Sequence, residues 1–282
     1  MNWRLGVIIL MGLLGINGPG ETAETARHRA LVPAGDAQLD TIVEGDGPLV
    51  VMLPSRGRDS EDYDEVAADI ARQGFRVLRP QPRGMLGSTG PMHGLTLHDY
   101  ADDAAAVIQS QHAGPAVIVG HAYGNWVARM TAVDHPTLVR GIVLAAAAAK
   151  NYPRSLSVAV SKSGDPSVPE TERRRYVEQA FFASGHDPSA WMTGWHPEAS
   201  ESEGEAAEAT PQAAWWSGGN VPLLDLQASE DPFKPASTRN ELRDEFGDRV
   251  SIVVIPGASH ALLPEAPQAV AEAIVGWIKR LP

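Results

Sequence analysis

The 282-residue chain contains no cysteine, which excludes disulfides, thiolate nucleophiles and cysteine-ligated metal sites. Its nine histidines show no spacing typical of metal ligands, so we expect no metal site. Basic residues are outnumbered: 23 Lys and Arg against 35 Asp and Glu give a net charge of -12. Since no basic stripe is present to neutralise phosphates, we expect no nucleic-acid partner.

The N-terminus has the pattern of an export signal. A short basic start is followed by an apolar run, Leu5 to Ile16, that is too short to span a bilayer comfortably, and then by helix breakers at 17–20. We therefore expect residues 1–26 to form a signal peptide or an N-terminal anchor, and the protein to be exported, either periplasmic or secreted. A wrongly assigned start codon is the alternative.

Short apolar segments alternate with helical patterns over most of the remaining chain. Such alternation predicts an α/β fold, a mostly parallel sheet with helices on both faces. The expected strands are 41–44, 49–53, 75–78, 116–119, 141–146, 223–227 and 250–255. The expected helices are 60–74 with Ser60 as its cap, 98–111, 125–135, 170–183, 237–245 and a last helix with its apolar face over 270–281.

The alternation stops between residues 147 and 220. This segment is polar and irregular, with a Ser, Pro and Gly-rich stretch at 161–169 and an acidic run at 201–208 that we expect to be solvated. We interpret it as a lid, residues 147–220, inserted into a core formed by residues 27–146 and 221–282. It also holds tryptophans that we expect to form a small hydrophobic core, with some lining an apolar pocket: Trp191, Trp195, Trp215 and Trp216.

The segment 117–129 predicts a strand, a sharp turn and a helix. Its turn, Gly120-His121-Ala122-Tyr123-Gly124, follows the Gly-x-Ser-x-Gly pattern of a nucleophile elbow, with alanine in place of the serine. Glycines are needed there because the turn brings backbone against backbone. The pattern therefore predicts the elbow of a catalytic site whose attacking atom is missing.

Two further candidates follow later strands, in the chain order expected after an elbow. Asp231 lies four residues past the strand 223–227, and His260 follows the strand 250–255. An acid there would orient the imidazole and stabilise the imidazolium as it forms. The spacing predicts a His-Asp dyad.

Together these motifs, with Leu53-Pro54-Ser55-Arg56-Gly57 and the Arg83-Gly84 loop that ends in Gly87-Ser88, resemble the α/β-hydrolase superfamily from about residue 39 onward. The resemblance implies a helical lid and an oxyanion hole made by the backbone N–H groups of Tyr123 and of a residue near Arg56. It also implies hydrolysis, without a cofactor, of a small-molecule substrate such as a partly apolar ester, lactone or related acyl compound.

The alanine at 122 excludes a serine-type acyl-enzyme route through that position, and several interpretations follow. In the first, His260 and Asp231 act as a general base on water or on the substrate. In the second, the alanine is an engineered replacement that traps a substrate. In the third, the chain is a pseudoenzyme that binds a ligand. A lyase or proton-transfer enzyme using the same dyad is a further alternative.

Other side chains near these motifs are weaker candidates for catalytic or binding roles. Ser55 is a candidate substitute nucleophile, and Arg56 and Arg58 are candidates to bind a substrate carboxylate, although exposed arginines are commonly solvated. His121 is expected to pack beneath the elbow. The Tyr123 hydroxyl could donate a hydrogen bond into the site or be buried against the lid.

Overall fold

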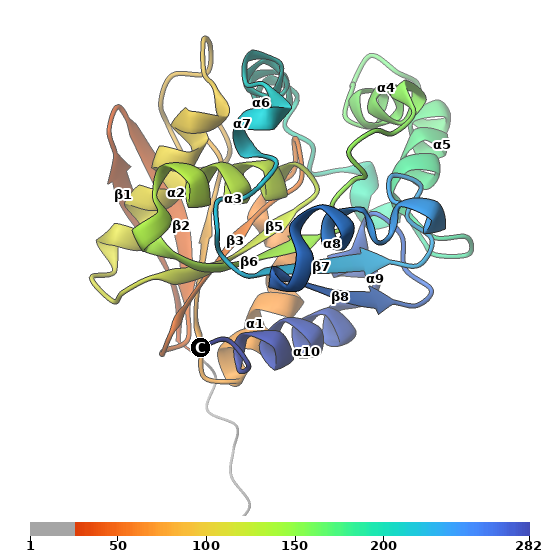
Figure 1. The fold of residues 1–282 in the computed structure, drawn as a ribbon. Helices are drawn as coiled ribbons and strands as arrows, with labels where there is room; N and C mark the ends of the chain where they lie inside the picture. Colours follow the sequence, from red (N-terminus) through yellow and green to blue (C-terminus); the bar gives the residue numbers. More distant parts are fainter. Residues whose placement is uncertain (1–25) are drawn as a thin grey trace, which may run out of the picture.

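Residues 26–282 are described by the computed structural model, in which an eight-stranded sheet has the order β1-β2-β4-β3-β5-β6-β7-β8 (Figure 1). The predicted leader therefore lies outside the described residues, apart from Ala26. The strands are β1 (Arg27–Ala34), β2 (Ala37–Glu44), β3 (Leu49–Leu53), β4 (Arg76–Pro80), β5 (Ala116–His121), β6 (Val139–Ala145), β7 (Leu223–Ala228) and β8 (Val250–Ile255).

Neighbouring strands from β4 through β8 are parallel, whereas β1 and β2 form an antiparallel hairpin that continues the sheet at its β4 edge. Every residue of β3, β5 and β7 is buried, as expected for strands covered by helices on both faces. The predicted fold class, a mostly parallel sheet flanked by helices, is confirmed.

Strand β1 was not predicted. Its sequence alternates only weakly, contains Pro33 and leaves Leu31 exposed, because β1 is an edge strand with a single partner. The strand is held by main-chain hydrogen bonds to β2, and only Val32 and Ala34, near its end, are buried in the core. The apolar pattern that revealed the other strands is therefore faint here.

Helices cover both faces of the sheet (Figure 1). Helices α1 and α10 lie together on one face, and α2 and α3 lie together on the other. The core helices are α1 (Asp64–Arg72), α2 (Leu97–Ser110), α3 (Tyr123–Asp134), α8 (Glu241–Phe246), α9 (Leu262–Glu265) and α10 (Pro267–Ile278). The predicted helix 60–74 is instead a 3-10 turn, Ser60–Tyr63, followed by α1, and the cap of that turn is Asp59 rather than Ser60.

Between β6 and β7 the chain forms helices and, within residues 147–220, no strand of the sheet. They are α4 (Arg154–Ser163), α5 (Glu170–Phe181), a 3-10 turn (Ser189–Met192), α6 (Pro197–Ala209) and α7 (Gln212–Trp215). We call residues 147–220 the insertion. Helix α6 contains the acidic run that we expected to be solvated, and its residue Glu203 is in fact buried.

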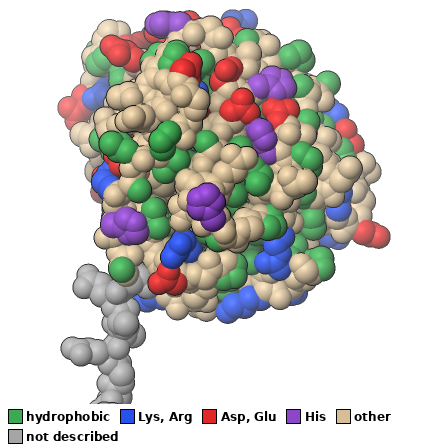
Figure 2. Space-filling model, turned by 90° about the vertical axis from the view of Figure 1, so that its left-hand side faces the viewer, with side chains coloured by type: hydrophobic (Ala, Val, Ile, Leu, Met, Phe, Trp, Pro, Cys, Tyr) green, Lys and Arg blue, Asp and Glu red, His purple; other side chains and the backbone are tan. Residues whose placement is uncertain are grey.

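No helix among residues 26–282 has both the length and the apolar character needed to cross a membrane. On the face shown in Figure 2, acidic and basic side chains are interspersed, and the basic ones form no continuous area.

Two glycine substitutions test how the fold is packed. A methyl group at Gly124 would overlap the carbonyl oxygens of Leu53 and Pro54, whereas one at Gly276, inside α10, meets only the end of the Arg280 side chain. We expect Gly124→Ala to lower the free energy of unfolding by about 3 kcal/mol or more, because backbone must move. Gly276→Ala should raise it by about 0.5–1 kcal/mol. Urea denaturation measures both, and equal effects would contradict the packing described.

Candidate active site

The turn between β5 and α3 holds Ala122 in a strained conformation, with φ of 47° and ψ of -111°. A positive φ is uncommon for a residue with a Cβ and costs on the order of 1–3 kcal/mol. Close backbone packing enforces it, since a Cβ at Gly120 would overlap the carbonyl oxygen of Gly124 and one at Gly124 would overlap that of Leu53. The turn therefore presents one side chain, a methyl group, at the carboxyl end of β5.

His260 and Asp231 follow β8 and β7 and lie within hydrogen-bond distance. Nδ1 of His260 is 2.9 Å from Oδ2 of Asp231, and both side chains are buried. Because the carboxylate accepts, we assign the proton of the neutral ring to Nδ1, which leaves the lone pair on Nε2. The other Asp231 oxygen accepts a hydrogen bond of 2.8 Å from the Phe233 N–H, and the Phe233 ring stacks on the imidazole with centroids 4.1 Å apart. The ring is thus held from two sides.

The backbone N–H groups of Arg56 and Tyr123 are unpaired. Within residues 26–282 neither donates a hydrogen bond to another protein group. Tyr123 begins α3, where the first N–H groups of a helix have no partner inside it and carry its positive dipole end. Arg56 and Tyr123 both line one cavity, and N–H groups without a protein acceptor at such a place suit an anionic or carbonyl oxygen.

A chain of buried hydrogen bonds connects the β3–η1 loop, residues 54–59 between β3 and the 3-10 helix η1 (Ser60–Tyr63), with the loop that carries His260. The Ser55 N–H donates to the hydroxyl oxygen of Tyr63 at 2.9 Å, and that oxygen lies 2.8 Å from Nδ1 of His121. Nε2 of His121 is 2.6 Å from the carbonyl oxygen of His260, so Nε2 must carry the proton and Nδ1 accepts from Tyr63. Burial lowers the pKa of His121 to about 3 and keeps the ring neutral. His121 therefore joins the loops as well as packing beneath the elbow.

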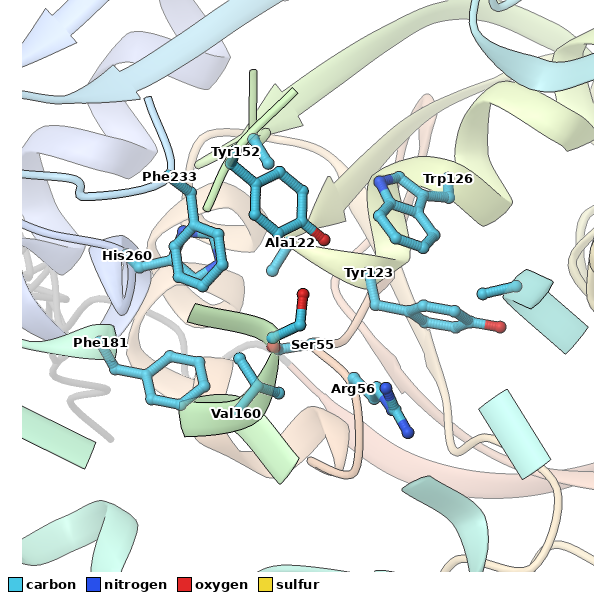
Figure 3. A pocket seen from close by; sticks show the side chains of 13 residues that line it. Ser55, Arg56, Ala122, Tyr123, Trp126, Tyr152, Val160, Phe181, Phe233 and His260 are labelled. Carbon is cyan, nitrogen blue, oxygen red and sulfur yellow. The ribbon is translucent and has the colours of Figure 1, made fainter. Parts of the chain in front are cut away.

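A small cavity of about 80 Å³ lies over these groups (Figure 3). In Figure 3 the Ser55 hydroxyl points into the same space as the side chains of Ala122 and His260, with aromatic rings around it. Helices α4, α5 and α6 of the insertion complete the wall. Its lining residues are Ser55, Arg56, Ala122, Tyr123, Trp126, Ala148, Tyr152, Ser157, Val160, Phe181, Ala207, Phe233 and His260.

The indole in this cavity comes from Trp126, and not from the insertion's tryptophans as we expected. Trp191 is instead buried in a hydrophobic cluster with Phe181, and Trp215 and Trp216 pack into the core beside α3. Trp126 lies four residues after Ala122 in the first turns of α3, so helical spacing from the elbow was the signal that could have identified it.

Tyr152 and Val160 were also missed, because they belong to a segment without regular apolar periodicity.

Arg58 is not available to bind a ligand in this arrangement. Its side chain is buried, and two of its nitrogens lie 2.7 Å from the carboxylate oxygens of Asp62. The guanidinium also packs over the rings of Trp191 and Trp195, at 4.8 and 4.9 Å from their centroids. The Tyr123 hydroxyl is buried and has no hydrogen-bond partner among the described residues, which favours the burial we considered for it.

Comparison with known proteins defines the class of the chain. The model of a family described as the alpha/beta hydrolase family matches residues 50–273, and the chain belongs to this family. The 2-(acetamidomethylene)succinate hydrolase of Mesorhizobium japonicum is 30% identical over 112 residues, which span 40% of this chain and 40% of that relative. The pyrethroid hydrolase of Sphingobium wenxiniae is 22% identical over 232 residues, 76% of this chain and 82% of the relative.

Among solved structures, an esterase from Exiguobacterium antarcticum superimposes with a TM-score of 0.74 over 88% of this chain and 98% of its own, at 17% identity. At this identity the likeness shows the fold alone.

The buried hydrogen bonds of His121 should contribute to the free energy of unfolding. Replacing His121 with Leu leaves the Tyr63 hydroxyl and the His260 carbonyl without their buried partner, each costing about 1–3 kcal/mol. We expect His121→Leu to lower the free energy of unfolding by about 2–5 kcal/mol, measured by urea denaturation at pH 7. His93→Leu is the control, because that side chain is 84% exposed, and it should change stability by less than about 0.5 kcal/mol. Similar values for both variants would show that the network is not stabilising.

Proposed function

We propose that the protein is a hydrolase of small, partly apolar esters, lactones or related acyl compounds that works without an elbow nucleophile. In this proposal His260 is the general base on water, Asp231 orients it, and the N–H groups of Arg56 and Tyr123 stabilise the oxyanion. The observation that carries it is that Arg56 and Tyr123, whose N–H groups have no acceptor among the described residues, line the same cavity as His260, to which Ala122 contributes only a methyl group.

In the proposed reaction Nε2 of His260 takes a proton from a water molecule, and the oxygen of that water attacks the substrate carbonyl carbon. The carbonyl electron pair moves to its oxygen, and the two N–H groups stabilise the resulting negative charge. The tetrahedral intermediate collapses by breaking the bond to the alkoxy group. The imidazolium returns its proton to the leaving oxygen, and an acid and an alcohol leave.

Two further features support this assignment. The cavity walls carry aromatic and aliphatic side chains, among them Trp126, Val160 and Phe233, which suits a partly apolar acyl or alkoxy group. Two relatives have names that describe hydrolysis, of 2-(acetamidomethylene)succinate and of pyrethroids. Those names describe the relatives, and they agree with hydrolysis as the reaction class for this chain.

The first test is turnover of a panel of short esters and lactones by the protein and by His260→Ala. We expect His260→Ala to lower kcat/KM by about 10²- to 10⁴-fold, because general-base catalysis contributes that much. His98→Ala is the matched control, an exposed histidine on α2 outside the cavity, and should leave the rate unchanged. Equal rates in all three proteins would exclude the dyad as the catalyst.

Reaction in ¹⁸O-labelled water separates hydrolysis from its nearest rival. Hydrolysis places one labelled oxygen in the acid product, whereas a lyase or proton-transfer enzyme using the same dyad incorporates none. A protein that binds a panel compound without turning it over would instead be either the ligand-binding pseudoenzyme or an engineered variant that traps substrate, and Ala122→Ser separates these two.

A substitution at the elbow tests whether water replaces the serine. If water is the nucleophile, Ala122→Ser should not raise kcat by more than about 10-fold, because the hydroxyl enters the space that the attacking water needs. A gain of about 10⁴-fold or more would show that the chain is an inactivated form of a serine hydrolase, since loss of a triad serine costs on the order of 10⁶-fold.

A further inference from the structure

The β3–η1 loop, which contains Arg56, contacts one stretch of the insertion, residues 193–203, in addition to its bonds to Tyr63 and Asp62. Each loop residue from 56 to 59 makes a polar contact with it. Arg56 Nε donates to the Ser200 carbonyl oxygen at 2.8 Å, and a guanidinium nitrogen of Arg58 donates to the Thr193 carbonyl oxygen. The Gly57 N–H donates to Oε2 of Glu203 at 2.7 Å, and the Gly57 carbonyl oxygen accepts from the His196 N–H at 3.0 Å. Oδ2 of Asp59 lies 3.1 Å from Nε2 of His196.

Glu203 is the buried carboxylate in this group of contacts, with 1% of its surface exposed. It lies on α6, where every other glutamate is exposed. The helix and loop are also packed closely, since a Cβ at Gly57 would lie 2.8 Å from Cβ of Ser200, and one at Gly204 would overlap the Arg56 guanidinium. A carboxylate is rarely buried unless it is hydrogen-bonded, and the hydrogen bond from the Gly57 N–H meets that requirement for Glu203.

The two peptide groups on either side of Arg56 are each fixed by a hydrogen bond. The Ser55 carbonyl oxygen accepts from the Arg58 N–H at 3.0 Å, and the Gly57 N–H donates to Glu203. The Arg56 N–H has no acceptor among the described residues and belongs to the first of these peptides, Ser55–Arg56. Its direction depends on the turn that the Ser55–Arg58 hydrogen bond closes, and the central peptide of that turn, Arg56–Gly57, is held by Glu203 of the insertion.

We propose that Glu203 is a positioning residue that holds the Arg56–Gly57 peptide, so that docking of α6 onto the β3–η1 loop completes the oxyanion hole. This inference rests on the proposed function in assigning the Arg56 N–H to the substrate oxyanion. Glu203 does not touch the substrate in this proposal. It acts through the backbone of the loop.

The charge of Glu203 adds a pH dependence. Burial raises the pKa of Glu203 to about 8, although the Gly57 N–H and the Arg56 guanidinium oppose this shift. Around it lie the Arg56 guanidinium from the loop, Tyr100 and Asp103 from α2 and Tyr123 from α3. The ionised form accepts the Gly57 N–H more strongly than the neutral acid, so the loop is held more firmly above pH 8.

The test compares Glu203→Ala and Glu203→Gln with Glu208→Ala, which removes an exposed glutamate from the same helix. With an ester that the wild-type protein hydrolyses, we expect Glu203→Ala to lower kcat about 10- to 100-fold at pH 7 with little change in KM, because one oxyanion donor is misplaced. Glu203→Gln keeps an acceptor and should stay within about 3-fold of wild type. Glu208→Ala should match wild type. Equal losses in the Ala and Gln variants, or none in a folded Ala variant, would overturn the proposal.

The pH profile gives a second readout that a merely structural residue would not move. The ratio of wild-type to Glu203→Gln kcat should be near 1 below pH 7 and rise about 3- to 10-fold above pH 9. In ¹⁵N-glycine-labelled protein, the Gly57 amide resonance should titrate with a midpoint near pH 8 in wild type and stay constant in Glu203→Gln. A Gly57 resonance that does not titrate in wild type would overturn the pH dependence, whereas the loss in Glu203→Ala tests the contact itself.

If the wild-type protein hydrolyses no ester, the proposed function fails, and binding still tests Glu203. A small alkyl phosphonate monoester mimics the tetrahedral oxyanion. Calorimetry should give a Kd at least about 10-fold weaker for Glu203→Ala than for wild type, with Glu208→Ala unchanged. Equal affinities, or no binding by wild type, would overturn the assignment of Glu203.

Discussion

The arrangement of the site depends on one buried imidazole, His121. It accepts a hydrogen bond from Tyr63, whose oxygen holds the Ser55 N–H, and it donates to the carbonyl oxygen of His260. The loop with Ser55, the elbow with His121 and the loop with His260 are thereby joined by one set of hydrogen bonds, and a shift of one of these loops alone would break at least one bond. Because burial keeps His121 neutral, the directions of these bonds do not change over the physiological pH range. The relative placement of the proposed base and the proposed Arg56 donor thus depends on a residue that the proposal does not place in contact with substrate.

The core of this arrangement could be predicted from sequence because its signals are local. Buried parallel strands appear as short apolar runs, and the elbow, Asp231 and His260 each directly follow such a run. The insertion gave no such signal. In helix α6 Glu203 differs from its exposed neighbours only through what packs against it, and the loop that does so lies 146 residues earlier in the chain. Local pattern cannot encode a contact of that separation, and Tyr152, in the same insertion, was not recognised as a cavity residue for the same reason.

The insertion contributes to the site as much as the sheet does. Its hydrophobic cluster includes Phe233 and Ala261, the residues beside the dyad, and the Ala261 N–H donates to the carbonyl oxygen of Phe181 at 2.7 Å. The loop bearing Arg56 is held by α6 and the residues before it. Both halves of the proposed machinery are therefore fixed by packing against the same segment. In the proposed mechanism, a displacement of the insertion would therefore disturb the base and one oxyanion donor together.

The strained backbone at Ala122 explains how this site can persist without a serine. The strain is enforced by the close approach of Gly120 and Gly124 to neighbouring carbonyl groups, not by any contact of a hydroxyl. Loss of an oxygen at that position removes a nucleophile but leaves the sharp turn, and with it the unpaired Tyr123 N–H at the start of α3. Replacing a side chain with any residue other than proline leaves the backbone N–H in place, and loss of one oxyanion donor costs about 10²- to 10³-fold in rate. In the proposed reaction the alanine therefore changes only the source of the attacking oxygen, and the cavity that Ala122 lines has room for a water molecule to supply it.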